Sequence, residues 1–258
     1  MSAPPFFTRY GFTRLADPAT PLVVEPYPEI CRGGVLRATI VASAIDLVGG
    51  FTTRALAGVD ATFTADLSLR IPTPGCPARL VAHAETLRAG RRLVTTGVRL
   101  EDDTGATFAE GVTTFTRIAR DPSEVADPAA LATPDTIPRH PLEAPLEQVV
   151  GIERQPDAPG RVRVPLRDAL RNPEGIMQGA LVALLIEEAA LDLAHPAIGD
   201  AAITSLDLRY LAAATDGPIV GQATRVGSAE ASMIRVELRD AGRDDRLTAT
   251  AFVRVAAL

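Results

Sequence analysis

The hydrophobic pattern consists of two long apolar stretches, each followed by shorter segments with alternating side chains. The apolar stretches cover residues 35–48 and 180–194. In the second stretch, residues 181–186 are apolar on every side, so we expect a helix buried in a core rather than one lying on a surface. About four β-rich segments joined by short polar turns follow each stretch, which favours antiparallel pairing. The pattern therefore predicts an α+β fold in which a curved antiparallel sheet wraps each long helix.

The same order of segments occurs twice, which indicates a duplicated unit. Residues 67–70 and 206–209 read Leu-Ser-Leu-Arg and Leu-Asp-Leu-Arg. Three more pairs of strands are expected at 79–88 and 218–226, at 92–101 and 232–240, and at 106–118 and 246–255. The separation is near 139 residues in the strands. It is near 146 when the glycine-containing segments before the two helices, residues 28–34 and 173–179, are aligned.

A proline-rich segment separates the two copies. Each Pro removes a hydrogen-bond donor and fixes φ, so neither a long helix nor a central strand is expected there. The prolines stand at positions 122, 128, 134, 138, 141, 145, 156 and 159. We predict a first unit at 1–118, a linker that wraps the surface at 119–160, and a second unit at 161–258. Two such units are expected to pair through their sheet edges, since unpaired edges promote aggregation.

Composition and charge restrict the partners and the location. With 47% hydrophobic and 22% charged residues the chain has the composition of an ordinary globular protein, and a net charge of −6 disfavours nucleic-acid binding. All 26 basic residues are Arg, which is typical of a GC-rich bacterial genome. No apolar run reaches the ~18 residues of a membrane span, and the first residues lack a signal-peptide pattern. We therefore expect a cytoplasmic protein with no membrane partner. Cys31 and Cys76 are too few for a disulfide framework.

The segment before the second helix resembles a signature of hotdog-fold thioesterases. In the phenylacetate-degradation branch it reads Asn, two residues, Gly, two residues, His-Gly-Gly, with a carboxylate eight residues after the first Gly of that pair. Asn172, Gly175 and Gly179 match it, and Glu187 stands at the carboxylate position. A Glu there is also similar to the 4-hydroxybenzoyl-CoA thioesterases. Gln178 takes the place of the His, and the second Gly of the pair is an alanine.

The first copy departs from this signature. Gly33 and Gly34, which follow Arg32, lie where His-Gly-Gly would be. Eight residues after these glycines stand Val41 and an alanine, neither of which is a carboxylate. Asp46 follows on the same helix, out of register by about a turn or more. We therefore expect the first copy to have lost one of the two sites of a symmetric pair.

The resemblance implies a double hotdog fold, two tandem units each with a long central helix. It also implies acyl-CoA thioesterase activity, with CoA present only as part of the substrate and no further cofactor. In the family the two helices run antiparallel, and each carboxylate faces the start of the opposite helix. Hotdog pairs often associate further, so a homo-oligomer, a dimer of double hotdogs, is expected.

Thioester hydrolysis needs a carboxylate that either attacks the thioester carbonyl or activates a water molecule. It also needs hydrogen-bond donors aimed at the carbonyl oxygen. Glu187 lies about 12 Å along its own helix from that helix's free amides, so its donors must come from the other helix. The resemblance therefore places Glu187 opposite the amides around Gly33 and Gly34. The mirror site would set Asn172, Gln178 and Gly179 opposite Val41, without a base. Glu188 points about 100° away from Glu187 and is expected in solvent or paired with Arg.

Two other functions remain open at this point. A non-catalytic acyl-CoA-binding protein is favoured by Gln178 in place of His and by the missing carboxylate of the first copy. An enoyl-CoA hydratase of this fold uses an Asp and a His about five residues apart in the relevant loop, and it is disfavoured because we see no such pair there. A Gly-x-Ser-x-Gly motif is absent, and no spacing of His, Cys and Asp suggests a metal site.

Overall fold

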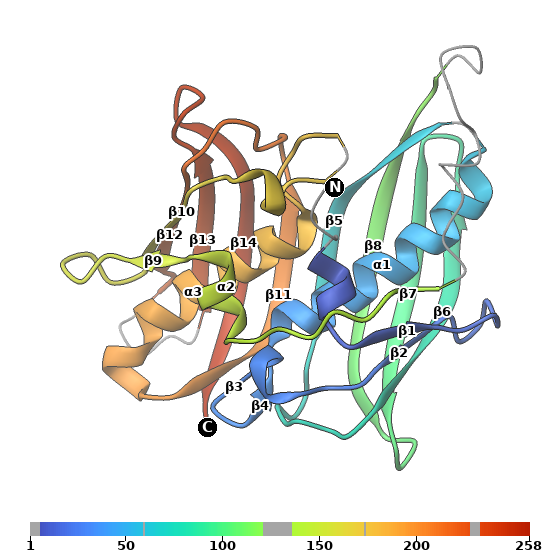
Figure 1. Ribbon diagram of the computed structural model, residues 1–258, viewed down its shortest axis with the longest axis horizontal. Coiled ribbons are helices and arrows are strands. Elements are labelled where there is room, and N and C mark those ends of the chain that lie inside the picture. Colours follow the sequence, from blue (N-terminus) through green and yellow to red (C-terminus); the bar gives the residue numbers. More distant parts are fainter. Residues whose placement is uncertain (1–5, 59, 121–135, 173, 228–232) are drawn as a thin grey trace.

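The computed structural model describes residues 6–58, 60–120, 136–172, 174–227 and 233–258 and folds them around one twelve-stranded antiparallel sheet (Figure 1). The order of strands across the sheet is β1-β2-β6-β7-β8-β5-β11-β14-β13-β12-β10-β9. Their bounds are β1 Phe12–Arg14, β2 Leu22–Val24, β5 Ala61–Arg70, β6 Leu80–Ala89, β7 Leu93–Asp102, β8 Thr107–Ile118, β9 Glu153–Arg154, β10 Arg161–Val164, β11 Ala201–Tyr210, β12 Ile219–Arg225, β13 Met233–Asp240 and β14 Arg246–Ala257. Two long helices, α1 (Ala38–Ala57) and α3 (Gly179–Ile198), pack against the sheet, which confirms the α+β prediction.

The sheet has two halves that meet at β5 and β11. These strands pair antiparallel, with Ser205 opposite Arg70 and Arg209 opposite Asp66, so the expected pairing through the sheet edges is present. Each half adds its strands outward in the same order, and the eight strands expected from the sequence are all found. Both central strands also carry an irregularity at matching places, after Thr64 in β5 and after Ile203 in β11.

The glycines before α1 form a turn rather than the start of the helix. Gly33 and Gly34, with φ of 57° and 79°, join the short strands β3 (Cys31–Arg32) and β4 (Val35–Leu36). Positive φ is accessible to glycine because it has no Cβ. The helix α1 begins four residues after Gly34, at Ala38, and this corrects the expected start at residue 35.

In the second half, an antiparallel bridge between Arg171 and Met177 takes the place of this hairpin. The helix α3 starts at Gly179, two residues after Met177. The two helix starts are therefore 141 residues apart, and the separation near 146 used for the alignment is wrong. In the correct register Asp46 and Glu187 each stand eight residues after the first residue of their helix. Both helices thus carry a carboxylate at the same position.

The proline-rich segment is described from residue 136 onward. It crosses from the first half to the second (Figure 1, yellow-green) and buries Leu142, Leu146 and Val150 on the way. It includes the short helix α2 (Leu146–Val150) and β9, which lies at the edge of the sheet, so its regular elements are short as expected. Pro122, Pro128 and Pro134 of the predicted linker lie outside the described residues, as do Pro173 and Ser232.

The core lies between the two helices and the sheet, where both helices bury most of their side chains. Single turns of 3-10 helix precede the two hairpins, η2 (Pro28–Ile30) and η5 (Asp168–Leu170), and a third, η1 (Phe6–Arg9), lies near the amino terminus. By length and hydropathy alone α1 would suit a membrane span, although no apolar run predicted one. Its packing against the sheet accounts for that apolar character.

Candidate functional site

The two helices lie side by side in opposite directions. Glu187 in α3 reaches the start of α1, and Asp46 in α1 lies beside the start of α3. The molecule therefore has two equivalent places where an acid faces a helix start. We call them the Glu187 site (Glu187 with Arg37 and Thr39) and the Asp46 site (Asp46 with Gly179 and Ala180).

In the Glu187 site the acid is bound by the protein itself. Its side chain is buried, and Oε2 accepts a hydrogen bond of 2.8 Å from the backbone N–H of Thr39. Oε1 lies 3.8 Å from Nη1 of Arg37, the residue immediately before α1, which is 2% exposed. Burial raises the pKa of Glu187 although Arg37 opposes this. The Thr39 amide at the start of α1 is thus already bound by Glu187 and is closed to a ligand.

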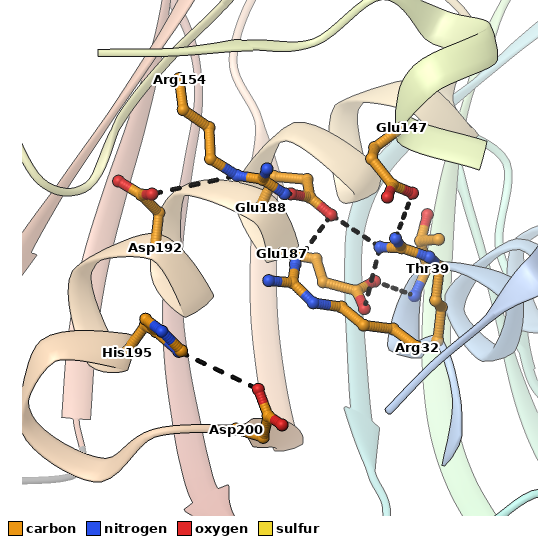
Figure 2. Close-up of polar contacts among 10 residues, drawn as sticks. Arg32, Thr39, Glu147, Arg154, Glu187, Glu188, Asp192, His195 and Asp200 are labelled. Carbon is orange, nitrogen blue, oxygen red and sulfur yellow. Dashed lines mark hydrogen bonds and ion pairs between the residues drawn. The ribbon is translucent and has the colours of Figure 1, made fainter. Parts of the chain in front are cut away.

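Glu188, next to Glu187, is the centre of a buried ion network (Figure 2). It is 0% exposed, accepts hydrogen bonds from Arg37 at 2.7 Å and from Arg32 at 3.1 Å, and is also paired with Arg154. Burial acts to raise the pKa of Glu188, but these three guanidinium groups outweigh it and hold the pKa below its usual range. Of the two expected positions for Glu188, solvent is wrong and pairing with Arg is confirmed.

The Asp46 site is arranged differently. Asp46 Oδ1 accepts a hydrogen bond of 2.7 Å from the hydroxyl of Thr64 on β5. Oδ2 faces the start of α3, where a methyl group placed on Gly179 would lie 3.6 Å from it. No arginine forms an ion pair with Asp46 in the part of the chain that the structure describes. Burial raises the pKa of Asp46 to about 6, although the hydrogen bond from Thr64 acts in the opposite direction.

A cavity of about 670 Å³ opens onto the Asp46 site. Asp46, Thr64, Gly179, Tyr210 and Asn172 contribute polar groups to its wall. Most of the remaining wall is apolar and includes Phe63, Phe115, Ile176, Val182 and Leu211. A mostly apolar cavity with a few convergent polar groups is the usual form of a small-molecule site.

The backbone donors at the start of α3 are free in this site. Within the described residues, the N–H groups of Gly179 and Ala180 donate to no acceptor, and both residues are partly exposed. Ala180 is the equivalent of Thr39, whose N–H is bound by Glu187. The first amides of a helix have no partner within the helix, and the helix dipole favours negative charge there. The Asp46 site thus combines an acid with helix-start donors that are unoccupied among the described residues, beside a cavity that Asp46 and Gly179 line.

The other residues predicted from the sequence lie in different surroundings. Gly33 and Gly34 are exposed in the β3–β4 turn and do not contribute to the start of α1. The side chain of Gln178 accepts from the N–H of Phe6 at 3.0 Å and donates to the carbonyl of Arg171 at 3.1 Å, so its amide is used in packing.

Asn172 lines the cavity, and its Oδ1 accepts from the N–H groups of Glu174 and Ile176 at 3.1 Å each. Gly179 is brought together with Asp46, and the expected partner Val41 is wrong. Sequence reasoning missed Asp46 as a site residue, along with Thr64 and Tyr210. Aligning the first residues of the two helices, which are 141 positions apart, pairs Asp46 with Glu187.

Comparisons with known proteins give a match by fold. Neither a family model nor a curated protein sequence matches the chain. Among solved structures it is similar to a tesB protein from Mycobacterium avium subs paratuberculosis (TM-score 0.62, 16% identity, 94% of each chain covered). It is also similar to an acyl-ACP thioesterase from Bacteroides thetaiotaomicron (TM-score 0.61, 14% identity, 91% of this chain and 95% of that one). A hot dog fold protein of unknown function from Alicyclobacillus acidocaldarius matches at a TM-score of 0.57, with 14% identity and 96% of each chain covered.

Because all three identities are below a fifth, these likenesses establish the fold alone. The chain has a hotdog-like fold, with helices packed on a large antiparallel sheet, and its structural neighbours include thioesterases. The resemblance seen in the sequence is thereby confirmed at the level of the fold.

Proposed function

We propose that the protein hydrolyses acyl thioesters of the acyl-CoA type and that the Asp46 site is its active site. One observation carries the proposal: at a cavity lined by Asp46 and Gly179, an oxygen of Asp46 faces the start of α3, where the amides of Gly179 and Ala180 have no acceptor among the described residues. A thioester carbonyl placed there would have a base on one side and hydrogen-bond donors on the other. Hydrolysis needs these two elements.

The proposed reaction begins with Asp46 in its ionised form. Oδ2 takes a proton from a water molecule, whose oxygen attacks the carbonyl carbon of the thioester. The N–H groups of Gly179 and Ala180 stabilise the negative charge that develops on the carbonyl oxygen, helped by the dipole of α3. The tetrahedral intermediate then expels the thiolate, which takes up a proton, and the products are a carboxylic acid and a free thiol. Thr64 keeps the other oxygen of Asp46 fixed.

In a variant of this mechanism Asp46 attacks the carbonyl carbon directly and forms an anhydride that water then opens. Hydrolysis in ¹⁸O-labelled water under single-turnover conditions distinguishes the two routes. Direct attack, with water opening the anhydride at the Asp46 carbonyl, leaves the label on Asp46 and releases an acid that contains an unlabelled oxygen from Asp46 in the first turnover. Activation of water places the label in the released acid at once.

The predicted residues take different parts in this proposal. Gly179 belongs to the reaction site, because the lack of a side chain leaves room between Asp46 and the start of α3. We assign Asn172 to shaping the cavity wall and Gln178 to holding the amino-terminal segment. We assign Glu187 to the structure of the interface between the halves, and Gly33 and Gly34 to the β3–β4 turn.

The finer organisation remains part of the proposal. We describe the chain as a double hotdog with units at 1–118 and 161–258 joined by the segment 119–160. CoA enters only as part of the substrate, and no other cofactor takes part in the steps above. A cytoplasmic location and a homo-oligomer of double hotdogs remain predictions from the sequence and the resemblance.

The proposal is tested by following thiol release from a panel of acyl-CoA substrates with the wild-type protein and with Asp46→Asn. The wild type should release thiol, and the substitution should lower kcat/KM by about 100- to 10,000-fold, the range for loss of a general base. Asn is similar in shape to Asp, and its neutral amide is easier to bury than a carboxylate, so the melting temperature should not fall. Equal rates for the two proteins would exclude Asp46, and tight acyl-CoA binding without turnover would replace hydrolysis by a binding function.

A further inference from the structure

Tyr210 contacts the backbone at the point where the proposed reaction needs its donor. It is the last residue of β11, it lines the cavity, and its hydroxyl donates to the carbonyl oxygen of Gly179 at 3.2 Å. The carbonyl of Gly179 and the N–H of Ala180 belong to one planar peptide group. Tyr210 therefore binds the oxygen of the same peptide whose N–H has no acceptor among the described residues.

We propose that Tyr210 is a positioning residue for the reaction at the Asp46 site, acting through the Gly179–Ala180 peptide. The hydrogen bond fixes the plane of that peptide and so the direction of the Ala180 N–H. It also draws electron density toward the carbonyl oxygen, which makes the N–H a stronger donor, since linked hydrogen bonds polarise one another. This inference rests on the proposed function of the site.

The Glu187 site supports this role by contrast. The residue equivalent to Tyr210 is Ile71, which stands 139 positions earlier and is buried. An isoleucine cannot donate to the equivalent peptide of α1. Likewise the equivalent of Thr64 is Ile203, also buried. The two hydroxyl groups that hold the acid and the donor thus occur at the open site, and aliphatic side chains take their places at the occupied one.

The test replaces Tyr210 by Phe and measures both kinetics and the Ala180 amide. In Tyr210→Phe, kcat should fall about tenfold, less than the ~100-fold or more for loss of a direct oxyanion donor. KM should change by no more than about twofold, because the peptide matters most when charge develops on the carbonyl oxygen. The amide proton of Ala180 should move upfield in the NMR spectrum, which a packing role alone would not cause.

Tyr10→Phe is the matched control. Tyr10 is 0% exposed, and its hydroxyl has no hydrogen-bond partner among the described residues, so removing it should leave kcat and the Ala180 amide unchanged. Turnover that is lost in Asp46→Asn but unchanged in Tyr210→Phe would overturn the role of Tyr210 alone. A wild-type protein without turnover would overturn the proposed function and this inference together.

A second and independent observation concerns the two cysteines. The Sγ atoms of Cys31 and Cys76 lie 3.0 Å apart although the residues are 45 positions apart in the chain. A backbone hydrogen bond of 2.9 Å from Leu36 to Gly75 holds the two segments together. Cys76 is exposed, whereas Cys31 is half-buried. The structure therefore brings together two thiols, one of which is accessible to a reagent in solution.

We infer that Cys31 and Cys76 form a thiol–disulfide modification site that a small-molecule disulfide such as oxidised glutathione can oxidise. The thiolate of Cys76 attacks one sulfur of the oxidant and expels one thiolate. The thiolate of Cys31 then attacks the Cys76 sulfur of this mixed disulfide, which forms the Cys31–Cys76 bond and expels the second thiol. Two cysteine thiols are oxidised, and the oxidant is reduced to two thiols that take up the two protons.

The order of the steps follows from burial. Burial, the largest effect on Cys31, raises the pKa of its thiol to about 12, so Cys31 is rarely ionised at neutral pH. Since the thiolate is the nucleophile, Cys76 should react first and Cys31 should act as the resolving thiol.

Incubation of the full chain with oxidised glutathione tests this site. We expect the protein mass to fall by two hydrogen atoms, both titratable thiols to disappear, and the melting temperature to rise by several degrees, since the link closes a long loop. A dithiol reductant should reverse all three changes. Cys76→Ser should keep one titratable thiol and show no loss of hydrogen. Two thiols that persist, or a stable glutathione adduct on Cys76, would overturn the inference.

Discussion

The Asp46 site and the Glu187 site start from the same backbone arrangement, an acid eight residues into one helix facing the first turn of the other. They differ first in the length of the acid. Glu187 has one more methylene group than Asp46, and its carboxylate reaches the Thr39 amide at 2.8 Å. The shorter Asp46 is held back by Thr64, and the equivalent Ala180 amide remains free. An acid at a helix start thus leaves room for a ligand only when it stops short of the amides.

The residue before each helix is the second difference. Arg37 places a buried guanidinium between Glu187 and Glu188, whereas Gln178 turns its amide toward Phe6 and away from the cavity. Taking charges out of water is costly, and the buried Arg37 guanidinium offsets that cost through its ion pairs with Glu147 and Glu188. Ion pairs close one site, whereas the acid of the other has no ionic partner within the described part of the chain.

The largest effect is expected from breaking the closed site at Arg37. In Arg37→Met, Glu187 and Glu188 lose a buried cation, and the free energy of unfolding should fall by about 3–5 kcal/mol. Urea denaturation measures the change. Arg32→Met is the control, because the Arg32 side chain is 34% exposed and its pair should contribute at most about 1 kcal/mol. Similar losses in the two variants would show that burial of Arg37 has no special weight.

The comparison can also be tested by making the open site resemble the closed one. In Asp46→Glu the longer side chain should reach the Ala180 amide, as Glu187 reaches that of Thr39, and remove both the base and a donor from the cavity. We expect kcat/KM to fall by about 100-fold or more, because displacements near 1 Å have effects of that size. Thiol release measures the rate. Full activity in this variant would show that the length of the acid side chain does not decide whether the site is reactive.

The pH dependence of the rate gives a sharper test of the Asp46 site. Asp46 must be ionised to accept a proton, and its pKa is raised to about 6. Below that pH, kcat/KM should fall about tenfold per pH unit, and above it the rate should level off. Rate profiles between pH 4.5 and pH 8 measure the midpoint. A plateau that extends well below pH 5 would mean that another group is the base.

The smallest effect on the rate is expected at Glu187, the acid that the sequence predicts as catalytic. In Glu187→Gln the side-chain oxygen can still accept the Thr39 N–H, and the residue does not line the cavity. We expect kcat/KM to stay within about twofold of the wild type. The same assay and the same pH profile measure it. A loss as large as that of Asp46→Asn would move the reaction to the Glu187 site.

The sequence predicts much of the fold because the strands keep their alternating hydrophobic side chains and the two copies keep the same order of segments. The strands around Leu67 and Leu206 align at a constant separation, and the structure pairs these two strands at the centre of the sheet. The apolar run before Glu187 likewise predicts a buried helix, and α3 is one. These features depend on local pattern, which a single sequence contains.

The register of the two acids was missed for a physical reason. Glycine serves both positive-φ turns and close approach at a helix start, and the sequence does not distinguish the two uses. Gly33 and Gly34 are turn residues, whereas Gly179 begins a helix, so aligning them displaced Asp46 from its counterpart. Thr64 and Tyr210 could not be found this way, because they lie on strands that meet the helices only in the folded chain.

The junction of β5 and β11 joins the two halves within one polypeptide. In a symmetric dimer of identical chains, a substitution enters both copies of a site at once. Tandem fusion removes that constraint, because Arg37 and Glu187 can change while Gln178 and Asp46 do not. Under the proposed function, one gene can then keep a reactive site at one helix start and a stabilising ion network at the other. An isolated half would contain neither, since each site takes its acid from one half and its amides from the other.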